Sequence, residues 1–227
     1  MALRMIARRS LNGSMTLVGD IAQATAPGAA ASWEEVLTHL PSGNNEPRVR
    51  ELTLSYRIPA PNLELANKVL AIAAPDLATP KAVRSVGTPP RIIEVADGVG
   101  SSVEQLVAES VAIVQEESEA LGGGSVAVIA PESLIDMVDT ALEARSIDHG
   151  RATTASRNVS GPLHPKIALV PVQLVKGLEL DGTVVIEPAT ILDEEPQGLR
   201  ALFVALTRST KRLAVVHARS LPEAMRD

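Results

Sequence analysis

One arginine of this sequence lies in a place where a charge is hard to accommodate. In LFVALTRSTKRLAVVH (202–217), Arg208 ends an apolar run that should be buried. Burying a guanidinium is unfavourable unless an anion meets it. Arg208 therefore either pairs with a carboxylate of this chain or receives an anion from outside. We expect it at the edge of a sheet, partly exposed or loosely paired with a carboxylate.

Three further stretches place polar residues directly after apolar or β-rich runs. They are TLVGDIAQ (16–23) with Asp20 and Gln23, LTLSYRIP (52–59) with Arg57, and VKGLELDGTVVI (175–186) with Lys176, Gly177 and Glu179. Each alone also fits an ordinary turn, a surface carboxylate or a structural ion pair. Ligands of open α/β sheets bind outside the carboxyl ends of the strands. We therefore expect these residues to converge on that edge.

The segments that must position these residues alternate between strands and helices. Strands are expected at 15–19, 52–55, 91–96, 126–130, 167–175, 183–188 and 213–217. Helices are expected at 2–11, 33–40, 61–74, 102–121, 133–145 and 197–207. Most of these strands are apolar throughout, which is typical of a parallel sheet that helices cover on both faces. The fold class predicted is α/β, with three layers.

Composition narrows the function classes. The chain has 227 residues, a net charge of −6, no cysteine, and only Trp33, Tyr56 and Phe203 as aromatics. Disulfides, thiolate nucleophiles and cysteine zinc sites are excluded, and stacking platforms for nucleic-acid bases are scarce. No apolar run approaches the ~20 residues that span a bilayer. We expect a soluble, cytoplasmic protein without a membrane partner.

Several motifs of nucleotide and metal chemistry are absent. There is no GxxxxGK[ST] phosphate loop, and the glycines at 122–124 precede a strand, as in a plain turn. ILDEE (191–195) is interpreted as a solvated acidic loop rather than the metal-binding end of a strand. The four histidines have no ligand-like spacing. No metal site is predicted.

Taken together and in this order, the four stretches resemble the C-terminal motifs of superfamily 1 helicases of the UvrD/Rep type. VGDIAQ resembles motif III, LSYR motif IV, VKGLELD motif V and FVALTRSTKRL motif VI. Within that group, the sequences VGDIAQ and VKGLELD are similar to those of the HelD-like branch, whose members bind RNA polymerase. The resemblance covers roughly residues 10–25 and 50–220, and implies a RecA-like fold for the second domain of a helicase.

The resemblance also implies roles for single residues. Gln23 would sense the γ-phosphate of ATP, and Arg57 and Arg208 would reach that phosphate as arginine fingers. Glu179 would bind the ribose hydroxyl, and Gly177 would let the backbone approach. An arginine finger is worth about 10³–10⁵ in rate.

The resemblance divides the chain in two. Residues 1–45 would be a remnant of the first RecA-like domain, with motif III and a linker, and residues 46–227 the second RecA-like domain. A longer parent would be an ATP-dependent DNA helicase or translocase that uses ATP with Mg²⁺. This chain alone should neither hydrolyse ATP nor bind it tightly. Residues 1–45 should pack irregularly or mediate dimer contacts.

Two other interpretations stay open. The chain could be a non-enzymatic, HelD-like module that binds RNA polymerase, or a stand-alone nucleotide sensor. An in-frame GxxxxGK[ST] in the genomic sequence before Met1 would favour the ATP-dependent helicase or translocase. A start codon with nothing before it would favour the sensor.

Overall fold

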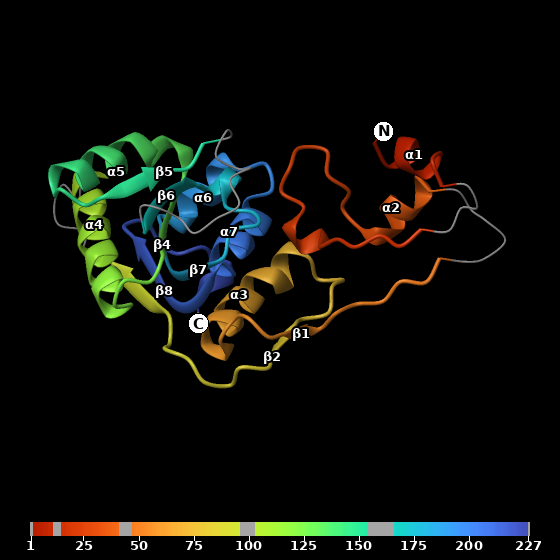
Figure 1. The fold of residues 1–227 in the computed structure, drawn as a ribbon, viewed down its shortest axis with the longest axis horizontal. Coiled ribbons are helices and arrows are strands. Elements are labelled where there is room, and N and C mark those ends of the chain that lie inside the picture. Colours follow the sequence, from red (N-terminus) through yellow and green to blue (C-terminus); the bar gives the residue numbers. More distant parts are fainter. Residues whose placement is uncertain (1, 11–14, 41–46, 96–102, 154–165, 227) are drawn as a thin grey trace.

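A computed structural model describes residues 2–10, 15–40, 47–95, 103–153 and 166–226 (Figure 1). Its centre is a six-stranded sheet of order β3-β8-β7-β4-β6-β5, in which every neighbouring pair is parallel. The strands are β3 (Arg91–Glu94), β4 (Val126–Ala130), β5 (His149–Arg151), β6 (Ile167–Pro171), β7 (Leu180–Ile186) and β8 (Ser209–His217). The predicted parallel α/β sheet is confirmed.

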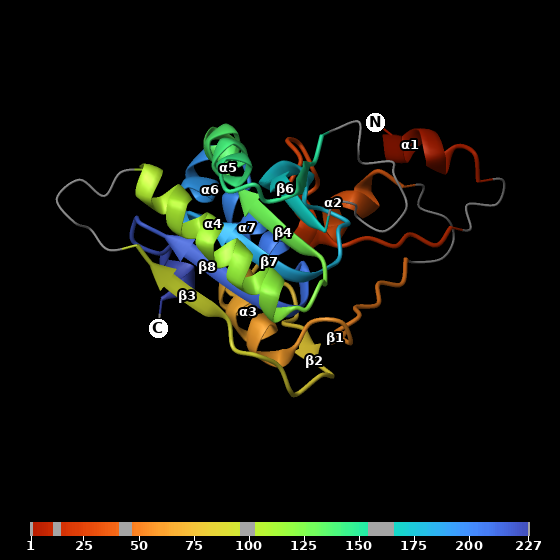
Figure 2. The same cartoon turned by 60° about the vertical axis from the view of Figure 1, so that its left-hand side comes forward.

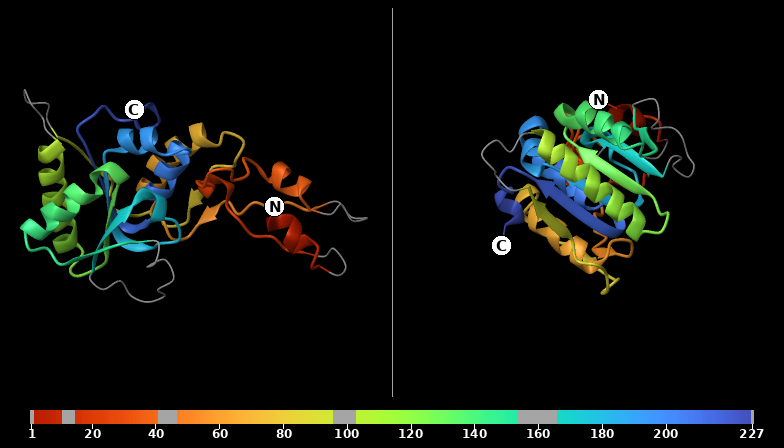
Figure 3. Two further views of the ribbon diagram at one scale, coloured as in Figure 1. Left: turned by 90° about the horizontal axis from the view of Figure 1, so that it is seen from above. Right: turned by 90° about the vertical axis from the view of Figure 1, so that its left-hand side faces the viewer.

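Helices form a layer on each face of this sheet (Figures 2 and 3). One layer holds α4 (Val103–Ala120) and α5 (Glu132–Ala144). The other holds α3 (Ala60–Ala73), α6 (Pro188–Glu194) and α7 (Gly198–Leu206). Among the described residues, no helix is long and apolar enough to cross a membrane.

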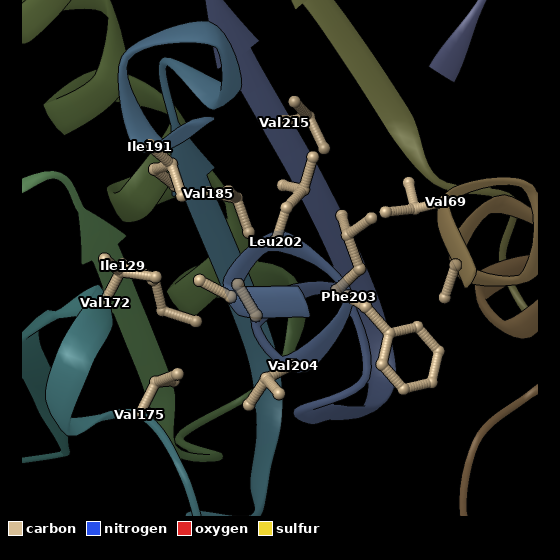
Figure 4. Close-up of a cluster of buried hydrophobic side chains, with 14 of the residues drawn as sticks. Val69, Ile129, Val172, Val175, Val185, Ile191, Leu202, Phe203, Val204 and Val215 are labelled. Carbon is tan, nitrogen blue, oxygen red and sulfur yellow. The ribbon is translucent and has the colours of Figure 1, made fainter. Parts of the chain in front are cut away.

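The core lies on both sides of the sheet because the central strands have no polar face. Along β4, Val126 and Val128 pack with α4 and α5, while Ala127 and Ile129 face the other layer. In that second layer, α7 is buried from Ala201 to Leu206. Figure 4 shows side chains of α3, α7 and the strands meeting there. Each buried aliphatic side chain contributes about 1.5–3 kcal/mol of transfer free energy.

A buried carboxylate fastens α4 to two strands. Glu117 is 1% exposed and accepts hydrogen bonds from Arg91 of β3, at 2.7 Å, and from Arg212 of β8. Burial raises the pKa of Glu117, but the hydrogen bonds from Arg212 and Arg91 outweigh burial, so the pKa is lowered overall. This cluster is a structural ion pair network.

A second charged cluster fastens the edge strand β5 to α5. His149 has Nε2 2.7 Å from Oδ1 of Asp139 and Nδ1 2.8 Å from the carbonyl oxygen of Ile147. Both ring nitrogens thus face acceptors, which the imidazolium satisfies by donating twice. Burial lowers the pKa of His149, but these two contacts outweigh it, so the pKa is raised overall.

The N-terminal region extends away from the sheet (Figures 1 and 3). It contains α1 (Ala2–Ala7), the 3₁₀ turn η1 (Ile21–Gln23) and α2 (Trp33–Thr38). Ser32 is the N-cap of α2, because its hydroxyl accepts from the amide of Glu35 at 3.3 Å. The described residues of this region contain no strand. The described residues of this region therefore pack irregularly, as predicted. A dimer contact and the domain boundary at residue 45 stay predictions.

The predicted buried strand at 15–19 is wrong. This stretch belongs to no strand or helix, and Val18 is 91% exposed. A strand needs a neighbour for its backbone N–H and C=O groups, and no described residue pairs with it. The predicted strand at 52–55 is only β1 (Leu54–Ser55), which pairs with β2 (Lys81–Ala82) outside the main sheet.

Two more expectations differ from the structure. The predicted loop at 191–195 is largely helical, because α6 begins with Pro188, whose fixed φ suits a first turn, and Ile191 is fully buried. The strand expected at 167–175 ends at Pro171 and turns into η3 (Val172–Leu174), since proline lacks the amide that a sheet needs. A last turn, η4 (Glu223–Met225), follows β8.

Candidate nucleotide site

The predicted site residues meet at the amino-terminal ends of two strands, not at the carboxyl ends. Glu179 directly precedes β7 and Arg208 directly precedes β8, and the amide of Leu180 donates to the carbonyl of Arg208 at 3.2 Å. The reason is the direction of the connections. Residues 172–179 lead from the end of β6 back to the start of β7, and α7 leads back to the start of β8. The expected convergence is confirmed, but on the opposite edge.

Arg208 is buried, which corrects the expectation of a partly exposed or carboxylate-paired side chain. It is 3% exposed. Its guanidinium donates to the carbonyl of Val204 at 2.9 Å, the carbonyl of Leu178 at 3.4 Å and the hydroxyl of Thr207 at 3.1 Å. None of these acceptors is charged, and no salt bridge joins Arg208 to a carboxylate within the described parts of the chain. The reason is that the end of α7 folds around the side chain.

The charge of Arg208 is therefore poorly compensated. Burial and, to a smaller extent, the nearby charge of Arg57 lower its pKa, which is about 10 overall. Asp20 and Glu179 act in the opposite direction, more weakly. Because a pKa of about 10 lies above neutral pH, Arg208 still carries its charge at pH 7. An anion placed beside it would relieve an unfavourable electrostatic situation.

Arg57 and Glu179 form an ion pair at the surface. Nη1 of Arg57 donates to Oε1 of Glu179, and their side chains are 41% and 57% exposed. The two residues are 122 positions apart in sequence, so the pair joins the segment before α3 to the turn before β7. An exposed pair of this kind is worth only about 0–1 kcal/mol. A ligand can separate these two side chains at little cost.

Gln23 is brought to the same place by η1. Its side-chain amide donates to Asp20 at 2.6 Å, and its carbonyl accepts from Nζ of Lys176 at 2.8 Å. Ile21 and Ala22 are buried, and η1 packs on α7. Two of the four sequence stretches therefore contact each other directly.

Gly177 has a backbone reason to be glycine. Its φ is +88°, in the left-handed region that side chains with a Cβ avoid. A Cβ at this position would meet nothing within 4 Å, so close packing is not the reason. The turn between η3 and β7 requires this conformation to bring Glu179 next to Arg57.

A cleft of about 720 Å³ lies between the N-terminal region and the main domain. Gln23, Arg57 and Arg208 line it, whereas Glu179 and Gly177 lie outside its lining. A volume of 300–1,000 Å³ is usual for sites of small molecules and cofactors. The cleft is thus large enough for a nucleotide beside both arginines.

Two aromatic residues of the cleft were not selected from the sequence. Tyr56 is 69% exposed and lines the cleft next to Arg57, and Trp33 lines it from α2. An exposed ring at such a place can stack on a nucleobase. The available signal was composition, because the chain has only three aromatic residues and all of them, with the buried Phe203, line this cleft.

No metal site accompanies the cleft in the described parts of the chain. Those residues contain no group of three or more His, Cys, Asp or Glu side chains that could hold a metal ion. Asp20, the cleft carboxylate nearest Gln23, is already used to cap η1 and to bind that amide. The described residues do not fit a Mg²⁺ centre of their own.

The C-terminal domain of a possible DNA helicase from Lactobacillus plantarum WCFS1 has a similar structure. It has 20% sequence identity and a TM-score of 0.51, over 75% of this chain and 92% of that domain. This chain has the fold of that helicase domain. The fold, with its parallel sheet between two helical layers, matches the RecA-like fold expected from the four motifs.

Other comparisons add less. The arterivirus nonstructural protein 10, a helicase crystallised with DNA, matches with 19% identity over 70% of this chain and 33% of its own, but a TM-score of 0.35 carries no argument. No family model and no curated protein matches the sequence. The similarity therefore establishes the fold and leaves the residue roles to the site itself.

Proposed function

We propose that this chain is the C-terminal part of an ATP-dependent helicase or translocase, and that its cleft receives the phosphates of ATP. The observation that carries the proposal is Arg208, a buried guanidinium at the cleft that forms no salt bridge with a carboxylate of the described residues. Buried charges in proteins are normally paired. Arg57, another arginine of the cleft, makes the same place more attractive to a polyanion.

The chemistry that suits such a site is phosphoryl transfer. Its transition state spreads negative charge over the oxygens of the transferred group, and positioned positive charge stabilises it. Arg208 would hold this charge from a fixed position, and Arg57 would join it after leaving Glu179. Gln23 would orient a group beside the γ-phosphate. These roles come from the resemblance and agree with the positions that the residues occupy.

Glu179 would accept a hydrogen bond from the ribose. Its carboxylate is more than half exposed and reaches the cleft through Arg57. Gly177 would allow the backbone of the same turn to come close to the nucleotide. No step is assigned to Mg²⁺, because the described residues provide no centre for it.

A titration of the 227-residue chain with ATP tests this proposal. The fluorescence of Trp33, the only tryptophan, reports on the cleft that it lines. We expect a saturable change with a dissociation constant on the order of 1 mM, about −4 kcal/mol. Weak binding is expected because the chain has no phosphate loop. ATP hydrolysis by the chain alone should be undetectable.

Two variants make the titration specific. Arg208→Gln should weaken ATP binding about tenfold, as loss of a hydrogen bond to a charged group does. Arg50→Gln is the matched control, because Arg50 also lines the cleft but is exposed. Equal losses in both variants would mean general charge attraction. No saturable change at all would contradict the nucleotide site and favour a partner-binding module of the HelD-like kind.

DNA as the partner of a longer parent rests on the resemblance. The chain alone should bind single-stranded DNA weakly at physiological salt, because its net charge is −6. Its three aromatics cannot provide a track for base stacking. Fluorescence anisotropy with a labelled oligonucleotide measures this, and a submicromolar dissociation constant would contradict it.

A further inference from the structure

Arg84 joins the two backbone segments that carry Arg57 and Arg208. A single nitrogen, Nη1, donates to the carbonyl of Arg57 at 2.8 Å and to the carbonyl of Thr210 at 2.7 Å. Thr210 follows Arg208 by two residues, at the start of β8. Arg84 itself is outside the cleft lining. It therefore cannot act on a ligand by direct contact with the cleft.

The backbone around Arg84 is itself held in place. The carbonyl of Arg84 accepts from the amide of Ala60, the first residue of α3, at 2.9 Å. Just before it, β2 pairs with β1, and the amide of Val83 donates to Ser55 at 2.8 Å. Just after it, Gly87 lies so close to Pro59 that a Cβ would come within 2.5 Å. The side chain of Arg84 thus extends from a fixed base.

The connection through Arg84 can hold Arg57 near Arg208 although the two side chains carry the same charge. Arg57 and Arg208 repel each other, as the effect of Arg57 on the Arg208 pKa indicates. Arg208 is fixed by burial, whereas Arg57 lies in an exposed segment with a half-exposed side chain. Asn62 also contacts β8, through Ser209 at 3.0 Å, but it belongs to α3 rather than to this segment.

We propose that Arg84 is a positioning residue that sets the place of Arg57 relative to Arg208. The inference rests on the proposed function for its consequence, since the spacing of the two guanidinium groups then decides how well they share one polyphosphate. Its structural part concerns the ligand-free chain and is tested separately.

The ligand-free test measures the position of the Arg57 segment. Because the chain has no cysteine, spin labels attach only to two introduced ones, Tyr56→Cys beside Arg57 and Ala144→Cys on α5. We expect Arg84→Ala to broaden or shift the distribution of label distances. Lys81→Ala, which removes an exposed charge from β2, should leave the distribution unchanged. An unchanged distribution in Arg84→Ala would overturn the proposal.

The ligand test uses ATP and the fluorescence of Trp33, in chains without labels. Arg84→Ala should weaken ATP binding about threefold, within the usual coupling of contacting residues. In an Arg57→Ala background the same substitution should have no further effect, because Arg84 acts through Arg57. Its effect on the melting temperature should be the same in both backgrounds. Arg84→Lys should restore part of the affinity, since an ammonium also has several N–H donors.

The outcomes separate the two proposals. Equal weakening by Arg84→Ala with and without Arg57 would overturn the positioning role and leave the nucleotide site standing. A changed label distribution in a chain that binds no ATP would support the positioning of Arg57 and contradict the proposed function.

Discussion

Replacing Arg208 by methionine should make the chain more stable while weakening the ATP binding that we propose. The fall of the pKa to about 10 measures how strongly the folded state disfavours the charged side chain. Relative to the ordinary pKa of an arginine side chain, and with 1.36 kcal/mol for each pKa unit, the penalty is ~3 kcal/mol. Methionine fills a similar volume without a charge.

Part of that gain is lost with the hydrogen bonds of Arg208. One acceptor, the carbonyl of Val204, also receives the hydroxyl of Thr207 at 3.0 Å, so it keeps a partner. Each remaining bond is worth about 1 kcal/mol. The net expectation is a stabilisation of about 1–2 kcal/mol, or a rise of several degrees in melting temperature.

Thermal and urea unfolding at pH 7 measure this difference directly. At that pH the arginine is charged in both the folded and the unfolded state, so the full penalty is present. Between the folded and unfolded pKa values the unfolded chain binds more protons, so the penalty fades only above pH 10. A destabilisation above about 1 kcal/mol in Arg208→Met would refute the reasoning and identify Arg208 as a structural charge.

Three further predictions concern stability. Glu117→Gln should cost about 3 kcal/mol in urea unfolding at pH 7, because it leaves two arginines around a neutral buried group; a cost under 1 kcal/mol would contradict this. Since hydrogen bonds to the Ile147 carbonyl and to Asp139 raise the pKa of His149 despite its burial, this residue stabilises the fold below about pH 6.5, and the contribution is lost as the pH rises through the folded pKa. Between pH 5.5 and 8.5, the melting temperature should therefore fall more steeply with rising pH in the wild type than in His149→Gln. Gly198→Ala should destabilise by about 2 kcal/mol, because its Cβ would lie 2.6 Å from Cα of Leu192; an unchanged melting temperature would show that α6 can shift.

Much of the main sheet could be predicted because its central strands β4, β6 and β7 are mainly apolar. VAVIA, for example, is a strand in which every residue is buried. The edge strand β5, with the sequence His-Gly-Arg, has no such pattern and depends on pairing with β6. The stretch at 15–19 has a strand pattern but no partner among the described residues. A local apolar pattern therefore predicts a strand whose residues are buried. It does not predict whether a strand forms when this depends on pairing with a neighbouring strand.

The composition of the site was predictable, while its electrostatics were not. From the order and the residue types of the four motifs, we could predict that Gln23, Arg57, Glu179 and Arg208 lie close together. The burial of Arg208 depends on how the end of α7 folds around it, which no local pattern encodes. The contact between Arg84 and the Arg57 carbonyl likewise depends on β2, two residues that carry no strand signal.

The hydrogen bonds of Arg208 also decide when its side chain loses rotational freedom. Ordering a long flexible side chain of this kind costs about 1.5–2 kcal/mol of conformational entropy. The side chain of Arg208 loses this conformational entropy during folding, so the binding of an anion would not have to order it. Arg57, half-exposed, would be ordered only on binding. The two guanidinium groups thus differ in their entropic contribution to affinity, with Arg208 as the preorganised member of the pair.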